Sequence, residues 1–408
     1  MAIHLSTRSH RARQISYLLL GALLSLVVVD CGLRIVEATP LWRVFPVVEP
    51  ILGHPDREVG FDSTPGSKGV WPIEHRSFVR INSLGLRDVE RQRAKPAGSL
   101  RVGLLGDSMV EATQVGQEAT FGTLAERRLR AEGYNIELLN LAVAGPNPIR
   151  QLLRLEKRGY ALNLDWVVAN SSGASFVSGL LLDDSQNPAY ADAGDGRLVR
   201  GYAFRQRLSQ RYADHPLGHL FVALYQHSPL FRLLYLHMKK PWPELLGLPA
   251  AQAIPRSDPT VATSACDAAM AVLEPHTGLW RDHRPARAWA ATMQFLDDFA
   301  VSTRSHGVQV LYAVRDIPVS PLDCPLADGR RAELLSAMAA EFARRGMRFV
   351  DWSDAVAENL QGRDMRQLHG FGVQRGQGHL NYDGHRVWAT TLVNALRSEL
   401  LGGAASAK

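Results

Sequence analysis

The longest apolar run in the chain lies near its N-terminus, where residues 15–29 carry almost no polar side chain. If the run continues to residue 36, a helix over 15–36 is about 33 Å long at about 1.5 Å per residue, enough to cross a hydrocarbon core of about 30 Å. Arg8, Arg11 and Arg13 precede it, which favours an N-terminus on the cytoplasmic side. The pattern predicts a transmembrane anchor over 15–36 after a cytoplasmic segment over 1–14.

A cleaved signal peptide is the competing interpretation of the same segment. Val36 and Ala38 have the small-residue spacing that signal peptidase prefers, whereas Asp30 and Arg34 lie inside the stretch and favour an uncleaved anchor. The Asp directly before Cys31 argues against a lipoprotein. Either interpretation exports most of the chain. We expect a single-pass protein of a bacterial-type inner membrane, with the main domain in the periplasm.

Beyond the anchor, short apolar runs alternate with segments of helical spacing. Strands are predicted at 101–105, 136–141, 166–169, 308–314 and 348–351, and helices at 120–131, 149–158, 286–305, 330–345 and 383–400. Strands that alternate with helices of this length favour a parallel sheet covered on both faces. The predicted fold class is therefore α/β, with three α/β/α layers, over residues 99–400.

Three segments depart from this alternation. Residues 39–98 are rich in Pro, Gly and charge, which is typical of a stalk with a strand or two, one of them at 77–81. Residues 176–285 predict a helical insertion that shapes a pocket, rests on the membrane surface or simply extends the fold. Lys239, Lys240 and nearby aromatics favour the membrane surface, although a solvated face is the more common explanation of such residues. Residues 401–408 are expected to be a flexible tail.

Composition narrows the possible partners. The chain has 408 residues, 46% of them hydrophobic, which is typical of a globular protein. Its net charge of +6 comes from dispersed Arg residues, without the Lys/Arg runs and interleaved aromatics that follow a phosphate backbone. We therefore expect no nucleic-acid partner.

The three cysteines, Cys31, Cys266 and Cys324, lack the spacing of a structural zinc site. The sequence accordingly predicts no metal and no cofactor. In an exported domain Cys266 and Cys324 either form a disulfide or remain two free thiols, and the sequence leaves both options open.

Ser108 is the first candidate for chemistry. It follows the apolar run 101–105 at a predicted strand-to-helix turn, and parallel sheets present reactive groups at the carboxyl ends of their strands. Backbone N–H groups at such a turn can stabilise an anionic intermediate. A serine that only caps the following helix is the alternative.

His379 is the second candidate. It lies in a loop before the last predicted helix, and a histidine pKa of roughly 6.5 suits proton transfer near neutrality. Such a loop can return to the edge of the sheet that carries Ser108. An ordinary surface histidine is the alternative.

Taken together, these segments resemble the SGNH/GDSL hydrolase family over about residues 77–396. The similar segments are Leu-Leu-Gly-Asp-Ser at 104–108, Asn-Leu-Ala-Val-Ala-Gly at 140–145, and His-Leu-Asn at 379–381 with Gly-His at 384–385. The lead-in Ile-Asn-Ser-Leu-Gly-Leu-Arg-Asp at 81–88 is similar to exported, N-terminally anchored members. The resemblance implies a flavodoxin-like hydrolase fold.

The resemblance also implies roles for single residues. Ser108 would be the nucleophile and His379 its base, with the backbone N–H groups of Ser108 and Gly145 in the oxyanion hole. Asp107 would support the turn around the nucleophile. His385 is expected to pack or hydrogen-bond on the last helix rather than to act as a second base.

The chain departs from the family pattern at two positions. The oxyanion-hole Asn that follows the third strand in the family corresponds to Ala174, so Asn170 is the nearest possible substitute. The acid three residues before the histidine corresponds to Gly376. Local sequence therefore supports a Ser-His dyad. Asp351 and Asp383 are possible distant orienters of the histidine, but a strand-end acid and a helix N-terminal acid explain them equally well.

Two classes of function remain. The leading hypothesis is ester chemistry through an acyl-serine, with an ester or O-acylated carbohydrate as substrate and, as a variant, O-acetyl removal or transfer on envelope polysaccharide. The second is a catalytically inactive member that binds a glycan or an envelope partner. The departures at Ala174 and Gly376 are what the second hypothesis predicts.

Overall fold

The computed structural model describes residues 3–43, 52–71, 74–145, 147–172, 188–193, 197–201, 216–239, 283–315 and 328–401. The chain forms two compact units. One comprises residues 1–50 and 211–253, and the other comprises residues 51–210 and 254–408.

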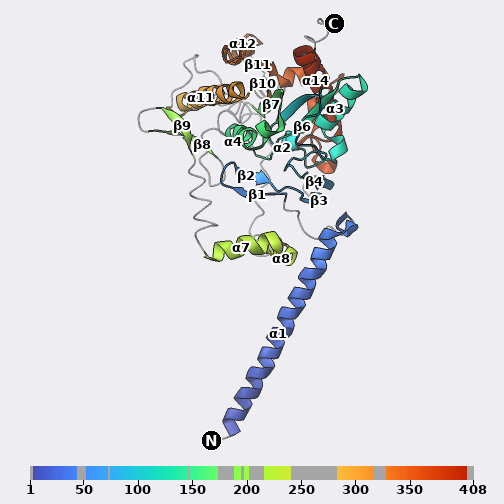
Figure 1. Ribbon diagram of the computed structural model, residues 1–408, viewed down its shortest axis with the longest axis vertical. Coiled ribbons are helices and arrows are strands. Elements are labelled where there is room, and N and C mark those ends of the chain that lie inside the picture. The colour runs from blue at the N-terminus through green and yellow to red at the C-terminus, as the bar shows by residue number, and fades with distance from the viewer. Residues whose placement is uncertain are drawn as a thin grey trace. The chain divides into compact units, whose positions relative to one another are not determined.

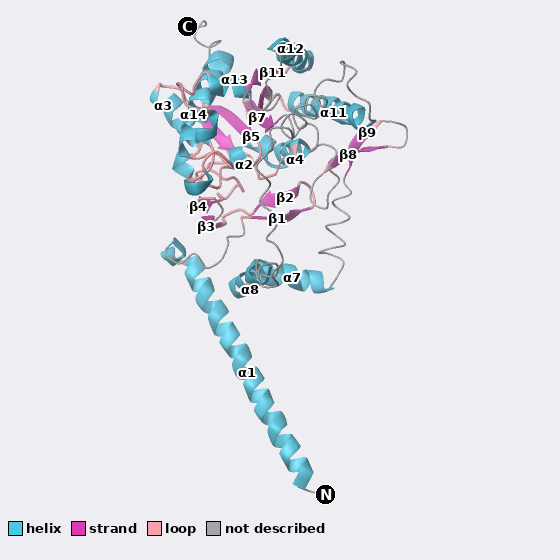
Figure 2. Ribbon diagram, turned by 180° about the vertical axis from the view of Figure 1, so that it is seen from behind, coloured by secondary structure: helices cyan, strands magenta, loops and turns pink. Residues whose placement is uncertain are grey.

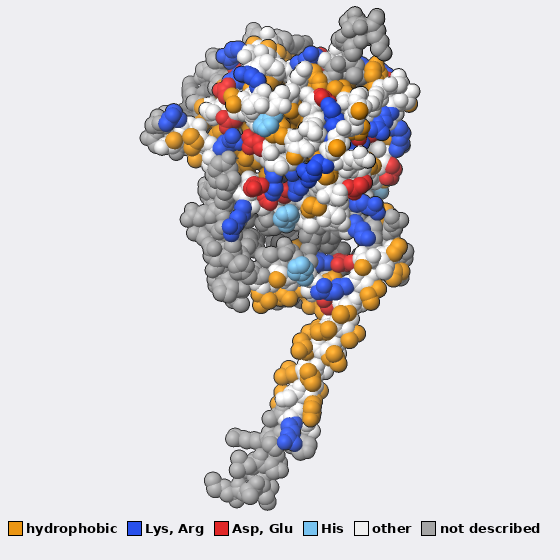
Figure 3. Space-filling view, in the orientation of Figure 1, with side chains coloured by type: hydrophobic (Ala, Val, Ile, Leu, Met, Phe, Trp, Pro, Cys, Tyr) orange, Lys and Arg blue, Asp and Glu red, His pale blue; other side chains and the backbone are white. Residues whose placement is uncertain are grey.

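Among its described residues, the first unit contains three helices and a short 3-10 turn, namely α1 (Ile3–Ala38), the turn Pro40–Arg43, α7 (Pro216–His227) and α8 (Pro229–Lys239). Helix α1 extends beyond the predicted 15–36 at both ends. Its segment Arg13–Ala38 is long and apolar enough to cross a membrane, and hydrophobic side chains cover its visible face (Figure 3). By length and composition this segment is either an anchor or a signal sequence.

The second unit is built around a five-stranded parallel sheet (Figure 1). Its strands are β5 (Leu100–Leu105), β6 (Ile136–Asn140), β7 (Trp166–Ser172), β10 (Gln309–Arg315) and β11 (Arg348–Asp351). Across the sheet the order is β11-β10-β7-β5-β6. In chain order this is 2-1-3-4-5, the flavodoxin-like winding, whose switch point lies between β5 and β7.

Helices cover both faces of this sheet (Figure 2). One face packs against α3 (Phe121–Ala131), α13 (Trp352–Ala357) and α14 (Tyr382–Leu396), and the other packs against α4 (Pro148–Arg154), α11 (His283–Ser305) and α12 (Asp328–Arg344). Successive strand residues alternate between the two cores, so that Leu311 lies in the first and Tyr312 in the second. The predicted three-layer α/β/α class is confirmed.

The lead-in segment contains more strands than the strand or two that the sequence predicted. It forms two antiparallel hairpins, β1 (Gly53–Asp56) with β2 (Gly60–Ser63), and β3 (Lys68–Trp71) with β4 (Ser77–Arg80). Asp62 at the end of β2 is fully buried between Arg154 and Arg158 near the end of α4. These hairpins are therefore part of the second unit.

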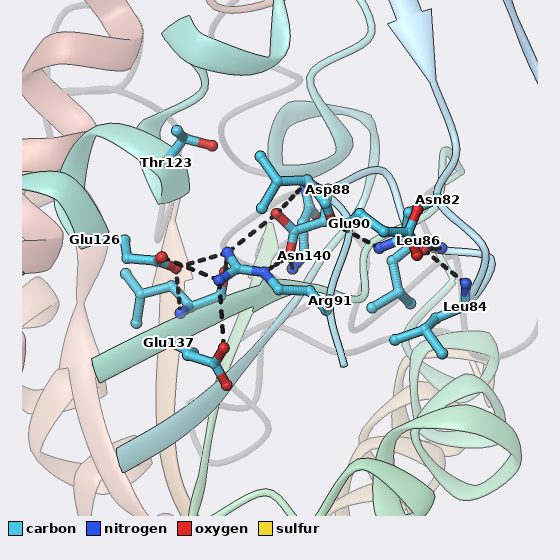
Figure 4. A network of polar contacts seen from close by, with 12 residues as sticks. Asn82, Leu84, Leu86, Asp88, Glu90, Arg91, Thr123, Glu126, Glu137 and Asn140 are labelled. Carbon is cyan, nitrogen blue, oxygen red and sulfur yellow. Dashed lines mark hydrogen bonds and ion pairs between the residues drawn. The ribbon is translucent and has the colours of Figure 1, made fainter. Parts of the chain in front are cut away.

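A buried polar network fixes the chain between the second hairpin and the sheet (Figure 4). The Asn82 side chain accepts hydrogen bonds from the backbone of Leu84 and Leu86, which closes the turn. Arg91 then pairs with Asp88 at 3.0 Å and with Glu126 of α3 at 2.7 Å. A single guanidinium thus ties the lead-in to a helix that covers the sheet.

The insertion at 176–285 is not wholly helical among its described residues. Besides α7 and α8 it contains the hairpin β8 (Ala189–Asp192) and β9 (Leu198–Gly201). Cys266 and Cys324 lie outside the described residues, so their pairing stays a prediction.

Candidate active site

Ser108 begins a short helix, α2 (Ser108–Glu111), three residues after β5 ends. Asp107 is the N-cap, and its Oδ1 accepts a hydrogen bond from the backbone N–H of Met109 at 3.0 Å. The serine is half-buried and lies at the carboxyl end of β5, beside the switch point of the sheet. Capping is thus performed by Asp107, which leaves the Ser108 hydroxyl for another contact.

A buried cation supports this turn from behind. The Arg315 guanidinium, at the end of β10, pairs with Asp107 Oδ2 through one nitrogen and donates to Asn170 Oδ1 on β7 through another. Both carboxylate and guanidinium are less than a tenth exposed. A planar, forked donor suits two acceptors at once, so Arg315 joins three strand ends around the nucleophile turn.

The loop that carries His379 is fixed by Asn381. The Asn381 side chain caps α14 by accepting from the N–H groups of Asp383 and Gly384, both at 3.0 Å. Its amide nitrogen donates to the carbonyl oxygen of Gln367 at 2.8 Å. The His-Leu-Asn segment therefore has one defined position at the edge of the sheet.

His379 bridges a serine and a carboxylate. Its Nε2 lies 2.8 Å from Oγ of Ser108, and its Nδ1 lies 2.7 Å from Oε1 of Glu74. Glu74 Oε2 also accepts the backbone N–H of His379 at 3.0 Å. The carboxylate thus holds both the ring and the backbone of the histidine.

Sequence reasoning missed Glu74. Of the two acids considered as orienters, Asp351 caps α13 through the N–H of Ser353, and Asp383 pairs with Arg386. Neither acid makes the contact with His379 Nδ1, which belongs to Glu74. The acid comes instead from the lead-in segment, for which the sequence pattern predicted a stalk with a strand or two and no site residue.

Glu74 is held in an unusual backbone conformation, with φ at 62°. Contacts of His75 and Ser77, the first and third residues after it, hold it there. His75 Nδ1 lies 3.1 Å from the carbonyl oxygen of Gln114, and the His75 ring stacks on Phe371 at 4.6 Å. The Ser77 hydroxyl donates to the carbonyl oxygen of Thr113, one residue before Gln114. A left-handed, non-glycine residue fixed by its neighbours is a recurrent feature of functional sites.

Gly378, directly before the histidine, leaves room for this carboxylate. A Cβ atom there would lie 2.9 Å from Glu74 Oε1, and its φ of 84° also favours glycine. The close approach of Glu74 to the His379 backbone therefore requires a glycine at this position.

Gly145 lies in the loop after β6, the strand next to β5, with φ at 112°. Both backbone polar groups of the preceding residue are held: Glu111 Oε2 accepts the N–H of Ala144 at 2.7 Å, and Arg150 donates to the Ala144 carbonyl. Burial raises the pKa of Glu111 above its usual value, although the charge of the nearby Arg154 acts in the opposite direction. A Cβ at Gly145 would overlap the Arg150 guanidinium.

The two expected departures have different outcomes. Ala174 lies outside the described residues. Asn170 lies within β7, opposite Ala313 of β10, and its amide oxygen accepts a hydrogen bond from Arg315. Gly376 is described, and its N–H donates to the carbonyl of His369 in the loop that supports the histidine. The carboxylate that contacts His379 thus comes from Glu74 and not from the loop that carries the histidine.

His385 is buried on α14, and its Nδ1 accepts the backbone N–H of Phe121 at 3.3 Å. Desolvation lowers its pKa to about 3, and the Arg87 charge acts in the same direction. The expected packing and hydrogen-bonding role is confirmed for this residue.

No protein-family model and no curated protein matches this chain. It is similar to solved structures of an esterase from Pseudoalteromonas sp. (TM-score 0.36, 11% identity, covering 74% of this chain and 98% of that one) and of an acetyl xylan esterase (TM-score 0.34, 14% identity, covering 73% and 100%). A lipase/acylhydrolase from Enterococcus faecalis is similar at TM-score 0.34 and 11% identity, covering 73% and 96%. We therefore base the proposed roles on the geometry around Ser108.

Proposed function

We propose that the chain is an SGNH/GDSL-like hydrolase that cleaves ester bonds through an acyl-serine intermediate. The observation that carries the proposal is the continuous contact from Ser108 Oγ through the His379 ring to the Glu74 carboxylate. A serine with a base in hydrogen-bond reach, and a base oriented by an acid, is the arrangement that activates a hydroxyl nucleophile.

In the first half-reaction, Ser108 Oγ attacks the acyl carbon while His379 Nε2 takes the hydroxyl proton. Glu74 accepts the Nδ1 proton in a hydrogen bond, which fixes the tautomer and stabilises the positive imidazolium. The tetrahedral intermediate then expels the alcohol, which leaves with the proton from Nε2. The acyl group remains esterified to Ser108.

The second half-reaction repeats these steps with water. His379 removes a proton from the water, the water oxygen attacks the acyl carbon, and Ser108 leaves as a hydroxyl after it regains the proton. In our proposal the N–H groups of Ser108 and Gly145 hold the oxyanion in both steps. Their elements support this role, because α2 and the loop after β6 follow neighbouring parallel strands.

Asn170 takes a supporting role in this scheme rather than that of an oxyanion donor. Its amide oxygen binds Arg315, which in turn pairs with Asp107 at the cap of the nucleophile helix. We assign Asn170, Arg315 and Asp107 to the positioning of Ser108.

The Glu74 contact also separates the two classes of function. A binding protein that has lost its chemistry has no need to keep a carboxylate within 2.7 Å of the histidine and a serine within 2.8 Å on the other side. The left-handed backbone of Glu74 adds a local cost of order 1–3 kcal/mol, which the surrounding contacts must offset to keep the carboxylate at the histidine. Both features favour the enzyme.

For the substrate, we propose an O-acylated carbohydrate of the cell envelope, with acetyl removal or transfer as the reaction. The proposal rests on the exported position that the N-terminal helix predicts, together with the resemblance of the sequence motifs. It is the finer part of the proposed function and is tested separately.

The test is acetate release from an O-acetylated polysaccharide by the purified full chain, beside hydrolysis of p-nitrophenyl acetate. We expect both reactions in the wild type and neither in Ser108→Ala. Hydrolysis of the small ester alone would keep the esterase and overturn the carbohydrate substrate. Acetate found on an added acceptor sugar rather than in solution would identify transfer.

A further inference from the structure

The turn between α7 and α8 contacts the C-terminal part of α1 through a carboxylate. Asp30 Oδ1 accepts the hydroxyl hydrogen of Ser228 at 2.7 Å and the N–H of Leu230 at 3.1 Å. Ser228 is also the cap of α8, since its Oγ accepts the N–H of Phe231 at 3.0 Å. A negative charge at the start of an 11-residue helix is stabilised by the free N–H groups there.

A second pair joins the same two helices. Arg232, one turn into α8 and 4% exposed, pairs with Glu37 of α1. Asp30, Arg34 and Glu37 lie four and three residues apart, so they share one face of α1, and Arg34 pairs with Asp30 at 2.7 Å. The polar face of the last two turns of α1 is therefore the face that α8 covers.

Most of the exposed side chains that the structure describes on the α7–α8 hairpin are apolar. Arg232 and Lys239 are the only charged residues between positions 216 and 239, with histidine counted as neutral. Leu220 and Leu224, one turn apart on α7, are 54% and 37% exposed, and Leu234 on α8 is 48% exposed. A water-exposed hairpin of this length would ordinarily carry charges on its outer face.

Aromatic rings join the two helices of the hairpin. Phe221 packs edge-on against Phe231 at 5.5 Å and against Tyr235 at 5.3 Å, and Tyr225 packs edge-on against Tyr235 at 5.8 Å. Tyrosines at the end of a membrane span are typical of the boundary between hydrocarbon and headgroups.

The apolar run of α1 ends one residue before Asp30, and Asp30 contacts the hairpin. Residues 15–29 span about 22 Å at about 1.5 Å per residue, less than a hydrocarbon core of about 30 Å. The polar turns that follow have their partners on α8. The hairpin therefore lies beside the end of the apolar run.

We propose that α1 is a retained membrane anchor and that the α7–α8 hairpin lies on the lipid bilayer, near the C-terminal end of α1. Leu220, Leu224 and Leu234 are then in contact with lipid. Removal of α1 as a signal peptide would take away Asp30 and Glu37, the partners of the α8 N-terminus and of the buried Arg232. The contacts of Asp30 and Glu37 with α8 therefore support an uncleaved helix.

The test uses the full chain, purified from membranes and reconstituted into phosphatidylcholine vesicles that contain a lipid with a diazirine on its acyl chain. Intact mass shows whether residues 1–38 are retained. After illumination, mass spectrometry locates the cross-linked peptides. We expect label on α1 and on residues 216–239, and none on the peptide with Val301, an apolar residue of α11 that is 62% exposed.

A pair of variants completes the test. Leu224→Glu lowers labelling of residues 216–239 by about fivefold or more while α1 stays labelled, because a charge opposes burial in the interface. Val301→Glu, the matched control, leaves the pattern unchanged. A mature chain that lacks α1, or label confined to α1 in the wild type, would overturn the proposal and leave the apolar face for a protein partner.

Discussion

The carboxylate that orients His379 belongs to Glu74, which lies 305 residues earlier in the chain, and the two side chains meet at 2.7 Å. The lead-in segment before the sheet therefore contributes directly to the candidate site. Its attachment through Asp62, Asn82 and Arg91 fixes the position of the second hairpin, and with it the position of Glu74.

Replacement of Glu74 with Gln is expected to slow acylation of Ser108 by about 100- to 10,000-fold, because an amide no longer fixes the reactive tautomer of His379 or stabilises its positive charge. The rate of labelling by a fluorophosphonate measures the effect. Glu58→Gln, at a glutamate whose side chain is 64% exposed, is the control and should react at the wild-type rate. Equal rates for both variants would remove Glu74 from the mechanism.

Glu74 shows why part of the site was not predictable. The Ser108 and His379 motifs are local, and their positions before helices follow from strand, turn and capping patterns along the chain. The contact with Glu74 depends on a tertiary arrangement of two hairpins and on one left-handed residue, for which a short run of Pro, Gly and charge gives no signal. A glutamate beside a histidine in such a run is ordinary surface composition.

Arg315 is expected to matter for stability as well as for activity. Arg315→Met leaves Asp107 buried without its cation, which should lower the free energy of unfolding by roughly 3–5 kcal/mol. Arg386→Met breaks an exposed pair with Asp383 on α14 and should cost about 1 kcal/mol or less. Thermal unfolding of the full chain in mild detergent compares the two, and similar losses would contradict a supporting role for Arg315.

Gly145→Ala is expected to reduce the labelling rate by roughly 10- to 100-fold, because the new methyl group overlaps the Arg150 guanidinium and displaces the N–H that we place in the oxyanion hole. Gly133→Ala is a matched control. Its φ of 94° is equally unfavourable for alanine, but no atom lies within 4 Å of the added carbon. Wild-type reactivity of Gly145→Ala would show that this N–H does not contribute.

The buried His385 predicts a dependence of stability on pH. Its folded pKa of about 3 lies below the value of 6.5 expected when unfolded, so between these values the unfolded chain binds the extra proton. The contribution is present above pH 6.5 and is lost as pH falls, by roughly 2 kcal/mol between pH 7 and pH 5. His385→Asn, which keeps an acceptor for the Phe121 N–H, should lose correspondingly less stability over this range in thermal unfolding. If His385→Asn lost as much stability as the wild type between pH 7 and pH 5, the result would contradict a buried, neutral His385.

The central part of the fold was predictable from periodicity, and the insertion was not. Four of the five sheet strands, β5, β6, β7 and β10, are largely buried. The side chains of β11 are exposed or half-buried, yet its predicted and observed bounds of 348–351 coincide. Residues 189–192 and 198–201 instead pair as two short strands, with intermediate or exposed side chains in β9, so no apolar run marks them. The contacts of Asp30 with the turn at Ser228 are likewise long-range and leave no pattern in the sequence.

The most direct test of the proposed enzyme is covalent labelling of the purified full chain with a fluorophosphonate probe, beside Ser108→Ala and His379→Ala. We predict a single labelled site at Ser108 in the wild type, no label in Ser108→Ala and a rate at least about 1,000-fold lower in His379→Ala. Absence of wild-type labelling, under conditions in which a known serine esterase reacts, would contradict an activated serine and favour a binding protein.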